Sequence, residues 1–227
     1  MERDHAMAAA RAALSRLRCV VLIACSGRKQ LGGAPRLDPA PHGLLDQLRS
    51  ADRNAVLSTR QRLATLAHAQ PDAELGGSST QGRYRPAFER YRGRVYQPVD
   101  HHLWPREGNL RVVIVSALYG LLFAWEPIQD YELTMTSKAG HRERVAACWK
   151  QAGLGTAFAR WAAQQQVQCV IDLLSGHYRA ALRNLDVLRQ GGIQRIPFDY
   201  PGRFQASNLD RGFDLKELLA LDASSIP

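Results

Sequence analysis

The stretch that most constrains the fold is a run of apolar residues that leads directly into a polar and aromatic cluster. Residues 110–116 read LRVVIVS, and such a β-branched run bounded by turn signals is typical of a strand buried in a sheet. The residues of the following cluster are Ser116, Tyr119, Gly120, Asp130 and Tyr131. Because ligands of open α/β sheets bind beyond the carboxyl ends of the strands, this layout suits a site. The alternative is a core strand whose aromatic residues cap the hydrophobic layer.

Further buried runs alternate with helical patterns along the chain. The other predicted strands are 19–24, 167–174 and 193–198. The predicted helices are 5–17, 43–69, 141–166 with a break near Gly153 and Gly155, 177–192 and a last one from Asp214. Residues 71–82 form a polar Gly/Ser-rich linker. This order predicts an α/β fold with a mixed, partly parallel central sheet flanked by helices. We expect a single domain over 1–227 with a helical insertion at about 43–100.

Polar residues also follow two of the other predicted strands. The first group is Cys25, Ser26 and Lys29, and the second is Ser175, His177 and Tyr178. Parallel neighbouring strands would bring these groups and the cluster after residue 116 to one edge of the sheet. A lysine can lower the pKa of a nearby thiol or bind a phosphate, so the first group has the chemistry of a site. The alternative is a strand-end loop with a solvated lysine.

The charge of the chain favours a nucleic-acid partner. Its net charge is +9, and four of its 30 basic residues are lysines while the rest are arginines. Residues 83–100 interleave arginines with Tyr84, Phe88, Tyr91 and Tyr96, and such a mixture suits phosphate contacts and base stacking. The predicted nucleic-acid-binding residues are Arg83, Arg85, Arg90, Arg92 and Arg94. The alternative is an amphipathic helix with a solvated arginine face and its aromatic residues in the core.

Other classes of protein are disfavoured by the sequence. The four cysteines form no CxxC pair, and no metal-ligand spacing, GxGxxG or Walker loop occurs, so we expect neither a metal nor a cofactor. No run approaches the length that spans a membrane, and the first residues do not read as a secretory signal. We therefore expect a cytoplasmic protein with no membrane partner.

Three motifs resemble the peroxide-stress YaaA family. They are G-x-V-Y at 93–96, S-A-L-Y-G-L-L at 116–122 and P-x-x-x-Y-x-L-x-M at 127–135. Trp149 and the strand 171–175 with Tyr178 also sit where that family has similar residues. The Cys-Ser-x-x-Lys element at 25–29 is more similar to one in related proteins, including the core domain of archaeosine synthase, which modifies a deazaguanine base in tRNA.

The resemblance implies a YaaA-like fold and a DNA-binding protein linked to oxidative stress. A second hypothesis is an enzyme that modifies a nucleobase or nucleotide, with Cys25 or Ser26 as nucleophile, Lys29 stabilising negative charge and Asp130 orienting the amino edge of the base. The predicted ligand-binding residues are Tyr96, Ser116, Tyr119, Gly120, Tyr131, Ser175 and Tyr178. The partner would be DNA, RNA or a free nucleotide or nucleobase. A third hypothesis is a non-catalytic interaction protein whose aromatic cluster is core alone.

Overall fold

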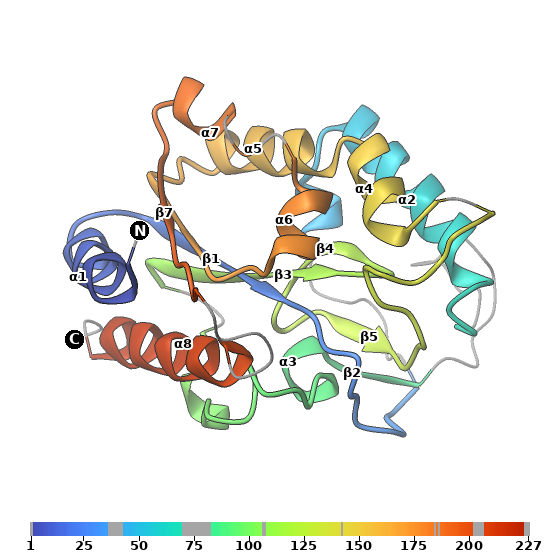
Figure 1. The fold of residues 1–227 in the computed structure, drawn as a ribbon, viewed down its shortest axis with the longest axis horizontal. Helices are drawn as coiled ribbons and strands as arrows, with labels where there is room; N and C mark the ends of the chain where they lie inside the picture. Colours follow the sequence, from blue (N-terminus) through green and yellow to red (C-terminus); the bar gives the residue numbers. More distant parts are fainter. Residues whose placement is uncertain are drawn as a thin grey trace.

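The computed structural model contains a five-stranded sheet with helices on both sides (Figure 1). It describes residues 2–35, 43–69, 83–105, 108–141, 143–183, 185, 187–201 and 207–224. The strands are β1 (Cys19–Ala24), β3 (Leu110–Ser116), β4 (Gly120–Phe123), β6 (Cys169–Asp172) and β7 (Gln194–Pro197), in the spatial order β4-β3-β1-β6-β7. Neighbouring strands are parallel except β4, which runs antiparallel to β3. The predicted mixed, partly parallel α/β sheet is confirmed.

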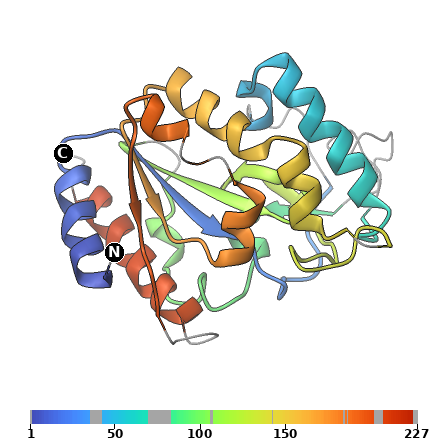
Figure 2. The ribbon, with the colours of Figure 1, turned by 45° about the horizontal axis from the view of Figure 1, so that its top comes forward.

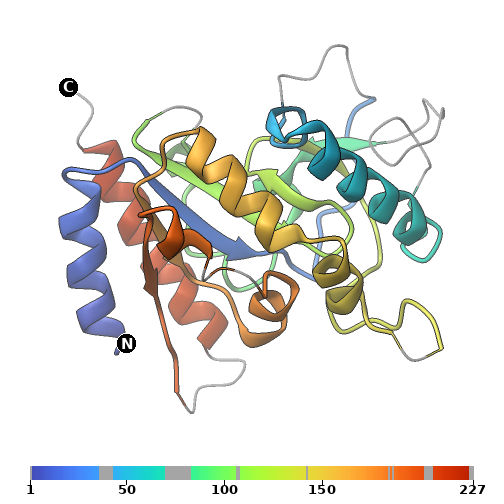
Figure 3. The same ribbon diagram turned by 90° about the horizontal axis from the view of Figure 1, so that it is seen from above.

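The first strand occupies the centre of this sheet. Every residue of β1 is at most 8% exposed, because β3 and β6 pair with its two edges. Helices α1 (Arg3–Leu14) and α8 (Ser207–Ala223) lie on one side of the sheet, and α2 (Ser50–Ala64), α4 (Val145–Gln151) and α5 (Leu154–Gln164) lie on the other (Figures 1 and 3). A strand covered on both faces needs a continuous apolar run, and β1 has one.

Two helical predictions are corrected by the structure, and a third is confirmed. The predicted helix 177–192 is two short helices, α6 (Gly176–Ala181) and α7 (Val187–Gln190). The chain turns between them, where the Leu185 amide donates to the Leu182 carbonyl. Helix α8 begins at Ser207, seven residues before the predicted start. The break predicted near Gly153 is present, because that glycine has a φ of +72° between α4 and α5.

The described parts of the segment 43–100 are less helical than predicted. It contains the 3₁₀ turn η1 (Leu45–Gln47) and helix α2, then strand β2 (Tyr84–Pro86), the single-turn helix α3 (Ala87–Arg90) and extended chain that leads to the 3₁₀ turn η3 (His101–Leu103). An amphipathic helix over the arginine-rich residues is therefore wrong. The backbone of β2 pairs instead with β5 (Pro127–Gln129) in a separate two-stranded sheet. Pro86 also disfavours helical geometry in the residue before it.

The linker predicted at 71–82 lies outside the described residues. No helix of the described ranges is long and apolar enough to cross a membrane.

Candidate functional site

The register of the central strands brings the three predicted polar groups to one edge of the sheet. Ala24 of β1 pairs with Val115 of β3, and Leu22 pairs with Asp172 of β6. The residues that follow each strand therefore leave the sheet on the same side. Figure 2 shows α6 close to the carboxyl end of β1. The expected convergence of the three strand ends is present in the structure.

The groups after β1 and β6 are joined by a contact between Cys25 and Tyr178. The Cys25 Sγ lies 3.2 Å from the Tyr178 hydroxyl, which also donates to the Cys25 carbonyl at 3.2 Å. Burial raises the pKa of Tyr178 well above its ordinary value, and the nearby Cys25 raises it further. Tyr178 is therefore a protonated hydroxyl that orients the thiol.

The other two predicted residues of the group after β6 make no such contact with Cys25. Ser175 precedes α6, and its side chain caps no helical amide. His177 is exposed.

Helix α6 is positioned by a buried carboxylate. Asp172, at the end of β6, is fully buried and accepts from Arg179 of α6 at 3.0 Å and from Arg195 of β7 at 2.6 Å. Its other oxygen accepts from the Leu174 amide at 2.9 Å. These bonds set where α6 begins relative to the sheet and therefore where Tyr178 lies.

Three hydroxyls form a closed, buried triangle after β3. Tyr91 and Tyr131 are 2.8 Å apart, Ser116 and Tyr131 are 3.0 Å apart, and Tyr91 donates to Ser116 at 3.2 Å. The Tyr119 amide donates to the Ser116 Oγ at 3.0 Å. Burial raises the pKa of both Tyr91 and Tyr131 well above the ordinary value, so the triangle is neutral. Sequence reasoning did not assign Tyr91 to this cluster. Its place in the arginine-rich segment gave no sign that it would reach Ser116.

Lys29 connects the first group to this triangle. Its Nζ lies 4.0 Å from the centre of the Tyr131 ring, a cation–π geometry. Burial lowers the pKa of Lys29 from its ordinary value of 10.5, and the charges of Cys25, Asp130 and Glu132 partly oppose that shift. The amine is therefore more easily deprotonated than a solvated lysine, as a nucleophile or proton carrier requires.

Several predicted site residues make contacts that support the scaffold. The Tyr96 hydroxyl donates to the Ala24 carbonyl at 2.8 Å, and the Tyr119 hydroxyl accepts from the Gln129 amide at 3.0 Å. Asp130 is half-buried, and its carboxylate accepts from the Tyr131 amide at 3.0 Å. Arg60 is fully buried and donates to the Tyr119 carbonyl at 2.8 Å. Sequence reasoning missed Arg60, because one arginine in a predicted helix resembles any solvated one.

The loop after β1 carries the arginine-rich segment. Lys29 and Ala34 form antiparallel bridges to Tyr91 and Tyr84, and the Arg92 amide donates to the Arg28 carbonyl at 2.9 Å. Gly93 packs against Ser26 so closely that a Cβ there would lie 2.3 Å from the Ser26 hydroxyl. Residues 26–34 and 84–93 thus run side by side, and the polar cluster adjoins the arginines.

The five predicted nucleic-acid-binding arginines differ in their surroundings. Arg83, Arg92 and Arg94 are exposed, and Arg85 is half-buried with its guanidinium 4.0 Å from Glu89. Arg90 is fully buried, and its guanidinium donates to the carbonyls of Gln30, Arg83 and Ile128. The guanidinium of Arg90 is thus held inside the protein, and the exposed arginines alone can reach a ligand.

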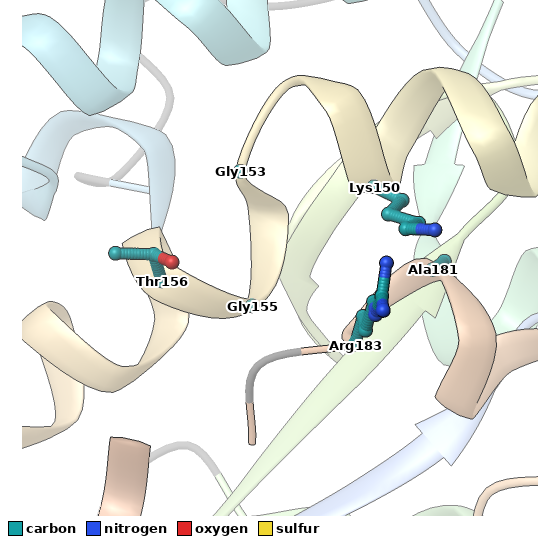
Figure 4. A pocket seen from close by; sticks show the side chains of 6 residues that line it. All are labelled: Lys150, Gly153, Gly155, Thr156, Ala181 and Arg183. Carbon is teal, nitrogen blue, oxygen red and sulfur yellow. The ribbon is translucent and has the colours of Figure 1, made fainter. Parts of the chain in front are cut away.

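Two of the cavities in the described part of the chain border the arginine-rich segment and the junction of α4 with α5. A groove of about 310 Å³ borders the arginine-rich segment and is lined by residues that include Phe88, Arg92 and Trp104. A pocket of about 260 Å³ lies where α4 meets α5, and Figure 4 shows Lys150 and Arg183 pointing toward each other across it. In the part of the chain that the structure describes, no three metal-ligating side chains gather closely enough to hold a metal ion.

Comparison with known proteins identifies the family. The family model described as peroxide stress protein YaaA matches residues 31–200. The chain belongs to the YaaA family. Two UPF0246 proteins from strains of Corynebacterium glutamicum are each 29% identical to it over 158 residues, which cover 68% of this chain and 61% of each relative. The chain thus spans less than two thirds of the length of these curated relatives.

The YaaA match covers only part of the candidate site. Ser116, Tyr119, Tyr131 and Tyr178 lie within the matched residues 31–200. The Cys25–Lys29 element lies before them, although its side chains contact Tyr131 and Tyr178. The Cys25–Lys29 element therefore belongs to the same candidate site as the matched residues, although it lies outside the match.

Proposed function

We propose that this YaaA-family protein is a cytoplasmic nucleic-acid-binding protein that protects DNA during oxidative stress. The observation that carries the proposal is the exposure of Arg83, Arg92 and Arg94 on a segment fixed beside the polar strand-end cluster. The backbone that carries these arginines is already ordered, and the guanidinium fork suits bidentate contacts to phosphate. The stress role rests on the description of the family as peroxide stress proteins.

The charge of the whole chain supports the same proposal. A net charge of +9 attracts a polyanion over a distance set by ionic strength. Local placement then decides which basic residues contact phosphates. Arg92 lies next to Arg28 in the paired segments, and both are exposed, so they form one basic edge beside the cluster.

Salt and two charge-matched variants test this proposal. We expect the protein to bind a fluorescent duplex at about 50 mM salt and to release it as salt rises toward about 200 mM, because binding displaces counterions. An Arg92→Ala, Arg94→Ala variant should lower the affinity about tenfold and reduce the salt slope by about two. Fluorescence anisotropy measures both quantities.

The control removes the same charge elsewhere. A Lys150→Ala, Arg183→Ala variant loses two positive charges from the pocket of Figure 4, on different elements from the arginine-rich segment. It should keep most of the affinity and the salt slope. Absent binding at low salt, salt-independent binding, or an equal loss in the control would each refute the proposal.

A second candidate function is an enzyme that modifies a nucleobase or nucleotide. It is favoured by the half-buried Lys29 amine, which lies over Tyr131 and is close to the thiol that Tyr178 orients. In this hypothesis Cys25, Ser26 or Lys29 reacts with the substrate and Asp130 binds it, with Ser175 at its margin. The buried triangle of hydroxyls would hold the Tyr131 ring in place beneath Lys29.

The reactivity of Lys29 tests this second candidate. Lys29 should be modified by an amine reagent with a half-maximal rate at a pH below 10.5, because burial favours its neutral form. Mass mapping across a pH series measures this, with exposed Lys150 as the internal reference. A Lys29 that stays unmodified while Lys150 reacts would count against a nucleophilic amine. A Cys25→Ala, Lys29→Ala variant with full activity in cells would exclude both as catalytic residues.

A further inference from the structure

The groove beside the arginine-rich segment has an aromatic floor. Phe88 and Trp104 stack at 5.2 Å between ring centres with 29° between their planes, and Tyr96 and Trp104 stack at 5.8 Å with 16°. All three side chains are nearly buried, so their rings form a fixed apolar surface. The groove encloses about 310 Å³, which is ample for a single planar ring system. Its floor suits a flat apolar face.

One wall of the groove is a histidine ring that is exposed but held in place. The His101 side chain is 66% exposed, and its Nε2 lies 2.9 Å from the Glu89 carboxylate. Its ring packs against Phe88 at 4.9 Å and against Trp125 at 6.1 Å, with interplanar angles of 65° and 90°. Three contacts fix the orientation of a ring that still faces solvent. Such a ring can stack on a ligand with little loss of its own freedom.

The rim of the groove is basic and polar. Arg92 and Gln97 line it and are exposed, and the side-chain amide of Gln97 donates to the Arg92 carbonyl at 3.4 Å. The same Arg92 belongs to the basic edge that it forms with Arg28. A ligand in the groove would therefore have the Arg92 guanidinium beside it, which can bind an attached phosphate. The side chain of Gln97 could form hydrogen bonds with the ligand at the rim of the groove.

We infer that this groove takes one unpaired base of a nucleic-acid strand, which stacks on His101 while its phosphate contacts Arg92. The inference rests on the proposed nucleic-acid binding and adds the kind of strand. An aromatic platform beside a basic edge is the arrangement that binds single strands without strict sequence preference. In a duplex the bases are stacked and paired with each other, so a base enters the groove only after unpairing. The protein therefore prefers single-stranded nucleic acid to duplex.

Two histidine variants and two forms of one oligonucleotide test this inference. We expect a fluorescent single strand to bind about tenfold more tightly than the duplex of the same sequence at equal salt. His101→Ala should weaken single-strand binding about tenfold, because it removes one stacking contact, and should leave duplex binding unchanged. His102→Ala is the matched control, since His102 is exposed on the same turn and does not line the groove.

A base analogue gives a second measurement. A 2-aminopurine in the single strand should lose fluorescence on binding, and His101→Ala should reduce that loss. If single strand and duplex bind equally and His101→Ala behaves as His102→Ala, the groove does not take a base and nucleic-acid binding still stands. If neither form binds at low salt, the proposed function fails as well.

Discussion

Arg90→Ala is expected to lower the free energy of unfolding by about 3–5 kcal/mol, although it replaces one arginine in a segment rich in arginines. Arg90 is fully buried, and its guanidinium donates to carbonyls of the loop after β1, of the residue before β2 and of β5. Alanine would leave three inward-facing carbonyls without that donor and would leave a cavity. Urea denaturation measures the change.

The neighbouring Arg92 provides the control for this prediction. Arg92 is exposed, so Arg92→Ala should change the unfolding free energy by less than about 0.5 kcal/mol while weakening nucleic-acid binding. Arg90→Lys should fall between wild type and Arg90→Ala, because an ammonium cannot reproduce the fork that reaches separate carbonyls. Equal denaturation midpoints for the two alanine variants would show that Arg90 does not hold these segments together.

Gly120→Ala should destabilise the protein by about 2–5 kcal/mol, for reasons of backbone and of space. Gly120 has a φ of +73°, and a Cβ there would lie 2.9 Å from the Trp149 ring and 3.1 Å from a Leu154 methyl carbon. The Trp149 ring cannot easily retreat, because it is fully buried and its indole N–H donates to the Ala117 carbonyl at 2.8 Å. Thermal or urea unfolding measures the loss.

Gly153 separates the two causes of this effect. Its φ of +72° is nearly the same, but no atom lies within 4 Å of a Cβ built on it. Gly153→Ala should therefore cost only the backbone strain, about 1–2 kcal/mol. The difference between the two variants is the packing contribution at Gly120. If both variants lost the same stability, the contact with Trp149 would be irrelevant.

The sheet could be read from the sequence where strands are buried on both faces. The apolar runs of β1, β3 and β6 predict strands without help from their neighbours, and their parallel pairing follows from the intervening helices. The edge strand β7 was also predicted, although Ile196 is the one residue of it that is buried. Strands β2, β4 and β5 are three or four residues long and were not predicted. These segments are strands because they pair with other segments of the chain, and their own short sequences do not indicate that pairing.

The candidate site was predictable in its location more than in its contacts. Polar residues after parallel strands indicate one edge, and the contacts of Cys25 with Tyr178 and of Lys29 with Tyr131 follow from it. The inward turn of Arg90 and the reach of Tyr91 to Ser116 depend on how the segment 83–94 folds over the loop after β1. A sequence of alternating arginines and aromatics does not tell which of them face inward.

The packing of α1 against α8 has a consequence for the order of folding. Arg3 and Asp214 are bonded at 2.6 Å across 211 residues of sequence, and Arg11 pairs with Glu217 on the same two helices. Helix α1 thus gains this partner only after the chain through α8 has been synthesised. Contacts of such long range slow folding, and the central strand β1 also waits for β3 and β6. Until those partners have been synthesised, the apolar faces of α1 and β1 lack them, so early folding intermediates expose apolar surface.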